Sequence, residues 1–185
     1  MEEWWRKGKF YYGDESNFLK IIDFYVFNCP VKGISQTAET FERKNWTNKN
    51  LTTLISEMKK SISPSKDNFI YIANGEIEDE YKRHDFTNNN YEFIIYKKSG
   101  ELSQTESIFY HIRNAIAHGS FSIVNSDKGN IYYFQSKRYS EIKSRIRLKE
   151  ETLLLWIDLF NSSASEIREK NKDRRQRKKY QNRKD

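Results

Sequence analysis

The chain has 185 residues, 36% of them hydrophobic and 32% charged, which favours a single domain with a modest core. Its only cysteine, Cys29, excludes an intrachain disulfide and a cysteine-rich metal site. No apolar run approaches the roughly 18 residues of a membrane span. The first residues are neither apolar nor basic enough for a signal peptide, so we expect a cytoplasmic protein with no membrane partner.

The formal net charge of +7 is concentrated at the C-terminal end. Residues 168–185 carry a net charge of +7, so the preceding residues are balanced. We expect residues 1–167 to form one domain and residues 168–185 to form a basic tail that frays or is disordered, because the tail has little apolar surface to bury. The tail either binds RNA through its cations or only solubilises the protein. Its candidate RNA-binding residues are Arg174, Arg175, Arg177, Lys178 and Lys179.

The first half of the chain contains two amphipathic helical patterns. Residues 1–13 mix aromatic and basic side chains, which suits either a segment packed across the domain or a base-stacking surface. A helix is predicted to begin at residues 14–16 and to extend through Val26. A second helix is predicted over residues 51–62, with Asn50 as its cap. The apolar run 69–73 suits a strand or a helix, and we favour a helix.

The second half of the chain alternates between strand and helix patterns. Strand-type residues at 91–97 precede a predicted helix over residues 104–118, which Gly119 can end in the left-handed conformation. Two strands, 120–124 and 131–136, are predicted to form a hairpin. Two further elements follow the hairpin. They are a third strand or irregular segment at 143–148 and a leucine-rich helix that starts near Lys149 and continues past Asn161.

The predicted helix 104–118 carries polar side chains close to its C-terminal end. At roughly 100° per residue, His111, Asn114 and His118 fall on one face. Arg113 lies about 140° around the axis from His118, but its side chain is long enough to swing across. A guanidinium and an imidazole can therefore meet at one phosphate.

The string from Ile112 to Gly119 reads Ile-Arg-Asn-Ala-Ile-Ala-His-Gly and contains an R-x4-H motif. Together with the apolar helix before it and the hairpin and leucine-rich helix after it, this string resembles the HEPN superfamily, which includes many metal-independent ribonucleases. The resemblance covers about residues 102–160. It implies a mainly α fold: a HEPN-like helical bundle with a small antiparallel β-hairpin or sheet inserted after the motif helix.

The resemblance also implies an endoribonuclease that needs no metal or cofactor and leaves 2′,3′-cyclic phosphate and 5′-hydroxyl ends. RNA supplies the 2′-hydroxyl nucleophile, and the protein must move protons and stabilise charge on phosphorus. We assign His118 to proton transfer or to orienting the 2′-hydroxyl, because imidazole titrates near neutrality. We assign Arg113 to transition-state charge. Asn114 would fix the imidazole tautomer or bind the sugar, and His111 would be auxiliary.

A single Arg–His pair does not easily supply both an acid and a base. The resemblance implies a homodimer with two motifs across one cleft, and the small Ala115 and Ala117 beside the motif suit the close approach of a second subunit. It also implies a toxin or an anti-phage, abortive-infection effector, with a possible antitoxin or regulatory partner.

Three alternatives remain open. A non-catalytic HEPN protein would bind RNA or nucleotide, or serve as a dimeric scaffold. A metal-dependent nuclease would use the acidic cluster at residues 76–80. A helical interaction domain would leave His118 at the negative end of its helix and Arg113 paired with a carboxylate such as Asp158. His84, next to the acidic cluster, is expected to be an ordinary surface histidine.

Overall fold

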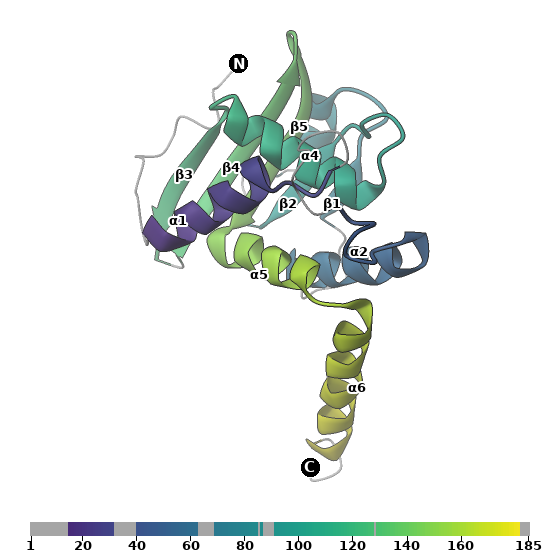
Figure 1. Ribbon diagram of the computed structural model, residues 1–185. Coiled ribbons are helices and arrows are strands. Elements are labelled where there is room, and N and C mark those ends of the chain that lie inside the picture. Colours follow the sequence, from purple (N-terminus) through teal and green to yellow (C-terminus); the bar gives the residue numbers. More distant parts are fainter. Residues whose placement is uncertain are drawn as a thin grey trace.

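The computed structural model describes residues 15–31, 40–62, 69–84, 86, 91–127 and 129–181 (Figure 1). The helices in these ranges are α1 (Glu15–Ile22), the π-helix η2 (Asp23–Phe27), α2 (Asn48–Ile62), α3 (Ile77–Arg83), α4 (Gln104–Ala117), α5 (Glu150–Asn161) and α6 (Ala164–Gln181). The strands are β1 (Ile70–Ile72), β2 (Phe93–Tyr96), β3 (Phe121–Ser126), β4 (Gly129–Arg138) and β5 (Glu141–Lys149). The aromatic segment 1–13 lies outside the described residues, so both interpretations of it stay open.

The chain is α-rich, as expected, but the strands form one five-stranded sheet rather than a small insertion. Its order is β1-β2-β5-β4-β3. β1 and β2 pair in parallel, and all other neighbours are antiparallel. β3 and β4 follow the motif helix directly, and the turn between them uses Gly129 at φ +95°. The sheet is therefore the centre of the domain rather than an appendage to a bundle.

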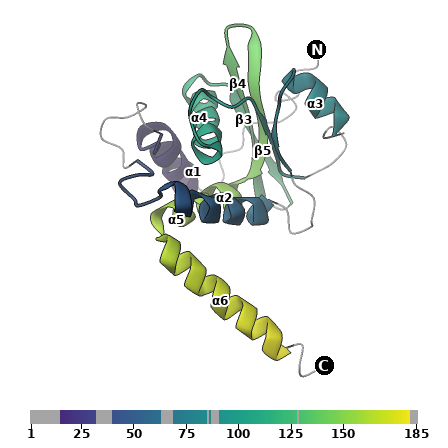
Figure 2. The ribbon, with the colours of Figure 1, turned by 90° about the vertical axis from the view of Figure 1, so that its right-hand side faces the viewer.

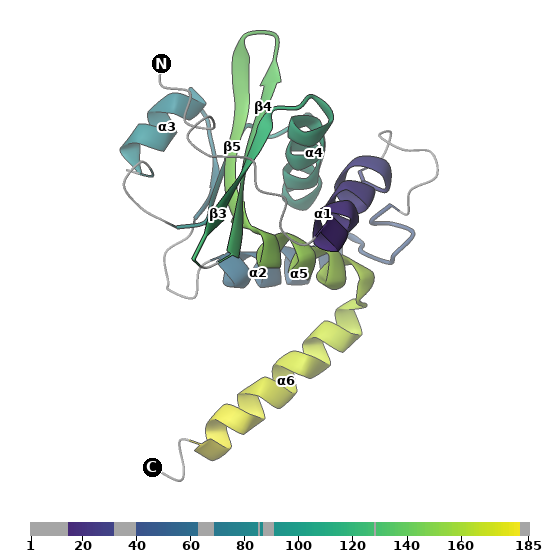
Figure 3. The same ribbon diagram turned by 90° about the vertical axis from the view of Figure 1, so that its left-hand side faces the viewer.

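Helices cover both faces of this sheet. α4 and α1 lie on one face and α3 lies on the other (Figure 2 and Figure 3). Because side chains alternate along a strand, β2 sends Ile94 and Tyr96 into the large core on the α4 side. It sends Phe93 and Ile95 into a smaller core beneath α3. Strand β2 is therefore buried on both faces.

Three local predictions were wrong. Ile70–Ile72 is a strand and not a helix, because parallel pairing with β2 satisfies its backbone. Asn50 lies in the first turn of α2 and does not cap it. Its side-chain oxygen instead accepts a hydrogen bond from Arg168 of α6 at 2.9 Å.

The leucine-rich helix α5 does not continue past Asn161, which is the third of these corrections. The chain breaks at Ser162 and restarts as α6. The Ser163 hydroxyl accepts the backbone N–H of Glu166, and the Glu166 carboxylate accepts the backbone N–H of Ser163, so a new helix is capped there.

Helix α6 projects away from the body at the end opposite the β4–β5 turn (Figure 1). Ala164 and Ile167 are buried, and Asn171 bonds to Glu57 of α2 at 3.1 Å. The boundary expected at residue 167 falls inside α6. The basic segment expected to fray or be disordered is described as helix through Gln181.

Candidate functional site

Helix α4 is held at both ends, which places its polar side chains accurately. At the N-terminus, Ser103 and Glu106 form a reciprocal capping box with bonds of 3.2 and 2.9 Å. At the C-terminus, His118 is the cap residue and Gly119 turns the chain at φ +63°. Ala115 on the opposite face is fully buried, so it is not available to contact a second subunit as proposed from the sequence.

A cavity of about 660 Å³ lies against the polar face of α4. His111, Asn114 and His118 all line it, so the fold brings these candidates together. Five cationic residues from the end of β2 and from the β4–β5 hairpin also line it, and no acidic residue of the described ranges does. These cations are Lys97, Lys98, Lys137, Arg138 and Lys143. The cavity is therefore suited to an anionic ligand.

Arg113 does not line this cavity. Its Nη1 donates to Asn114 Oδ1 at 3.3 Å, and its Nε is buried with no hydrogen-bond partner among the residues that the structure describes. Among the described residues no ion pair joins Arg113 to Asp158. The guanidinium is therefore connected to the cavity through the Asn114 amide, which lines it.

The Arg113 charge also acts on Cys29, which is fully buried on the inner side of α4. Burial raises the pKa of the Cys29 thiol to about 11. A backbone hydrogen bond from Val31 and the charge of Arg113 lower this pKa by smaller amounts. Cys29 is thus a protonated core residue.

His118 is exposed at the rim of the cavity. The Asn114 oxygen accepts from Arg113, and among the described residues no hydrogen bond joins Asn114 to the imidazole of His118. Within the described ranges, no hydrogen bond to the His118 ring is formed. The imidazole is free to take either tautomer and to meet a ligand.

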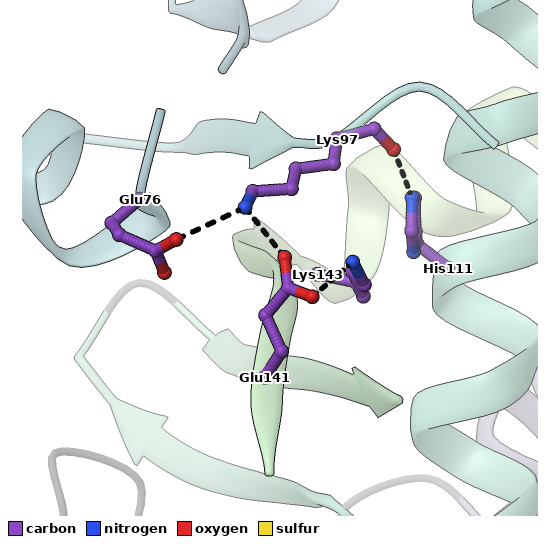
Figure 4. A network of polar contacts seen from close by, with 5 residues as sticks. All are labelled: Glu76, Lys97, His111, Glu141 and Lys143. Atoms are coloured by element: carbon purple, nitrogen blue, oxygen red, sulfur yellow. Dashed lines mark hydrogen bonds and ion pairs between the residues drawn. The ribbon is translucent and has the colours of Figure 1, made fainter. Parts of the chain in front are cut away.

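His111 is 1% exposed and is fully engaged (Figure 4). Its Nε2 lies 2.8 Å from the carbonyl oxygen of Lys97, and its Nδ1 lies 2.7 Å from the Ser136 hydroxyl. A carbonyl only accepts, so Nε2 carries the proton and Nδ1 accepts from Ser136. Burial lowers the pKa of His111 to about 4. This neutral imidazole joins α4 to β2 and β4 and has no proton to exchange near neutral pH.

Glu141 positions two of the lysines that line the cavity. Its carboxylate lies 2.5 Å from the ammonium group of Lys143 and 2.5 Å from that of Lys97 (Figure 4). The bonds to Lys143 and Lys97 lower the pKa of Glu141 to about 2. Glu76 adds a longer contact to Lys97 at 3.4 Å. Lys98 stays exposed, and no described residue pairs with it.

The acidic cluster at residues 76–80 does not converge on one point. Glu78 pairs with Arg145 of β5, while Glu80 pairs with Arg83 at 2.7 Å. No group of three or more His, Cys, Asp or Glu in the described part of the chain could hold a metal ion. His84 is also less exposed than expected: its ring stacks on Tyr71 with centroids 3.9 Å apart. These carboxylates serve as ion-pair partners.

The candidate residues of the tail are not brought to the cavity. Arg174 is exposed on α6, which leaves the body at the end opposite the β4–β5 turn (Figure 3). The side chains of Arg175, Arg177, Lys178 and Lys179 lie outside the described residues. Their proposed role in RNA binding is a separate question from the chemistry at α4.

Sequence reasoning missed the cationic residues of the hairpin. Lys137, Arg138 and Lys143 were not singled out, although they flank the turn of a predicted strand region. The sequence contained a sign of this site: basic residues cluster at one predicted turn between strands and do not alternate there with apolar residues. Only the pairing of β4 with β5 shows that this tip lies beside His118.

The fold and the cavity define an α-rich domain that presents a basic cavity at the end of one buried helix. A family model described as HEPN pEK499 p136 matches residues 9–171, and the chain belongs to this HEPN family. The match includes all of α4 and the whole sheet. No curated protein and no solved structure matches the chain. In the described ranges no helix has the length and apolarity needed to cross a bilayer.

Proposed function

We propose that this HEPN protein is a metal-independent endoribonuclease that acts at the cavity beside α4. The main observation behind the proposal is that His118, Asn114 and five cationic residues line one cavity, and that no acidic residue of the described ranges lines it. Such a site favours a phosphate and disfavours a divalent cation. Family membership supports an RNA-related, nuclease type of function in general.

In the proposed reaction, the 2′-oxygen attacks the adjacent phosphorus and the bond from phosphorus to the 5′-oxygen breaks. The 2′-hydroxyl gives up its proton to a base, and the 5′-oxygen takes a proton from an acid, which leaves a 2′,3′-cyclic phosphate and a 5′-hydroxyl. His118 carries one of these proton transfers. The cationic residues that line the cavity stabilise charge on the phosphate oxygens, and Arg113 orients Asn114 toward the substrate.

One exposed histidine supplies one acid–base group, so we propose a homodimer in which two His118 side chains face one substrate. His118 and Ala117 are both exposed at the end of α4, where a second copy can approach. In line with what the HEPN resemblance of the sequence implies, we also propose a role as a toxin or anti-phage effector, held inactive by an antitoxin or a regulatory partner.

The test is cleavage of a 5′-labelled single-stranded RNA in excess EDTA. Wild type should cleave and leave cyclic-phosphate ends, whereas His118→Ala should be slower by a factor on the order of 100 or more. His84→Ala is the matched control, because His84 is the C-terminal cap residue of α3 on the other face of the sheet. Equal cleavage by wild type and His118→Ala would refute the assignment of His118.

A non-catalytic RNA-binding HEPN protein is the second candidate. It is favoured by the position of Arg113, which does not line the cavity. This candidate predicts that wild type and His118→Ala bind single-stranded RNA equally and that neither cleaves it. Size-exclusion chromatography with light scattering on the same samples would show whether the bound form is a dimer.

A further inference from the structure

Tyr139 stands at the tip of the β4–β5 hairpin, where the strands rise beyond the rest of the sheet (Figure 2). It is 93% exposed, the highest value among the exposed large hydrophobic side chains of the described residues. A large aromatic ring that packs on no core is unusual. The position therefore gains nothing for folding from carrying tyrosine.

The backbone at Tyr139 makes this choice of residue more unexpected. Its φ is +55°, in the left-handed region that Gly, Asn and Asp favour and bulky side chains avoid. The two-residue turns that join antiparallel strands usually place Asn or Gly at such positions. Neither burial nor backbone preference accounts for a tyrosine at this position, which points to a role in contacting a ligand.

Tyr139 follows directly in sequence on residues of the candidate active cavity. Lys137 and Arg138, the two residues before Tyr139, both line that cavity. The Arg138 guanidinium lies over the Tyr139 ring, 5.9 Å from its centroid. Arg138 thus faces one side of the ring, and the near-complete exposure of the side chain leaves the other side open to solvent.

We infer that Tyr139 is a positioning residue of the proposed ribonuclease: its ring stacks on an unpaired base of the RNA strand whose phosphate lies in the cavity. Aromatic platforms beside cations are how proteins hold single-stranded nucleic acid. The surroundings favour RNA over a protein partner, because the ring is flanked by Arg138, Ser140 and Glu141 and not by an apolar patch. The inference rests on the proposed function and selects single-stranded RNA as the substrate class.

Binding can be measured without cleavage by placing all variants in the His118→Ala background and following fluorescence anisotropy of a labelled single-stranded RNA. Tyr139→Phe keeps the ring and should bind like the parent. Tyr139→Asn removes the ring but suits the positive φ, so it should bind about tenfold more weakly while its melting temperature stays the same or rises. Equal affinity of the Asn variant and the parent would overturn the inference.

A second arm locates the stacked base. A DNA strand with a single ribonucleotide restricts attack to one phosphate, and an abasic site is then placed at each flanking position in turn. One abasic position should weaken binding to the Tyr139 protein by about the same factor as Tyr139→Asn, with no further loss in the Asn variant. Additive losses at every position, or dimer dissociation on removing the ring, would refute stacking and indicate a structural or protein contact.

These measurements separate the two proposals. Loss of cleavage in His118→Ala tests the ribonuclease assignment and does not involve Tyr139. Loss of RNA affinity in Tyr139→Asn tests stacking and does not require cleavage.

Discussion

At the scale of single residues, the three histidines of this chain have three different environments. His118 is exposed at the cavity rim, His84 stacks on Tyr71, and His111 is buried between the Lys97 carbonyl and the Ser136 hydroxyl. His111 shares a helix face with His118, yet burial has made it a connection between α4 and the sheet. We propose that it positions the cavity wall rather than exchanging protons with substrate.

This role of His111 makes a pH-dependent prediction. The pKa of its imidazole is about 4 in the folded chain and near 6.5 when exposed. Between these values the unfolded chain binds a proton that the folded chain does not, so stability is lost as pH falls from about 6.5 to 4. Wild type should lose about 2 kcal/mol from this group between pH 7 and pH 5.

The variant His111→Gln should show a flatter pH dependence, because glutamine can donate to Lys97 and accept from Ser136 but does not titrate. Urea unfolding at pH 7 and pH 5 measures the difference between the proteins, which cancels the contribution of carboxylates such as Glu92. Identical pH profiles for wild type and His111→Gln would contradict the assignment.

At the scale of elements, α4 and α6 begin with the same capping box but differ in burial. Ser103 and Glu106 start a helix packed against the sheet and η2, whereas Ser163 and Glu166 start a helix that leaves the body. The same local chemistry therefore has different consequences for global stability.

We predict that Ser103→Ala lowers the free energy of unfolding by about 1 kcal/mol, because α4 unfolds with the core. Ser163→Ala should fray the first turn of α6 and leave the midpoint of global unfolding nearly unchanged. Urea titrations followed by tryptophan fluorescence report on the core, where Trp46 and Trp156 are buried. Equal shifts for the two variants would mean that α6 folds cooperatively with the domain.

At the scale of the whole molecule, the sheet separates the face covered by α4 from the face covered by α3. α4 and the β4–β5 turn form the cavity, while α3 covers buried arginines that contact aromatic rings, such as Arg145 over Tyr81 at 4.7 Å. α6 adds a separate cationic arm at the opposite end (Figure 1). RNA bound at the cavity would need a long path to reach this arm.

We predict that truncation after Asn171 leaves the melting temperature of the domain unchanged, since the contacts of α6 with α2 that involve Arg168 and Asn171 are retained. If the tail binds RNA, the truncated protein should bind single-stranded RNA more weakly and with a shallower salt dependence, by roughly 0.7 in the log–log slope per lost phosphate contact. Anisotropy titrations from low to high salt measure both. An unchanged slope would leave the tail with a solubilising role only.

The amino-acid sequence by itself determined the motif helix and the face it presents. The 3.6-residue period brings His111, Asn114 and His118 to one side, and Gly119 ends the helix at positive φ, because both depend on local geometry alone. The residues around Arg113 also identified the HEPN family correctly. The capping boxes Ser103–Glu106 and Ser163–Glu166 could also have been predicted from their spacing, but our sequence analysis did not include them.

Only the tertiary structure decided what surrounds that face. β1 and β2 are parallel neighbours separated by about twenty residues in sequence. The short apolar run at Ile70–Ile72 is a strand because it pairs with β2, and its own sequence does not reveal that partner. His111, a catalytic candidate in the sequence, is buried between β2 and β4 and connects α4 to the sheet. The pairing of β4 with β5 brought the basic residues of a hairpin to the cavity that His118 lines. Local spacing sets which way a side chain faces, whereas long-range packing sets its solvent access, its charge and its neighbours.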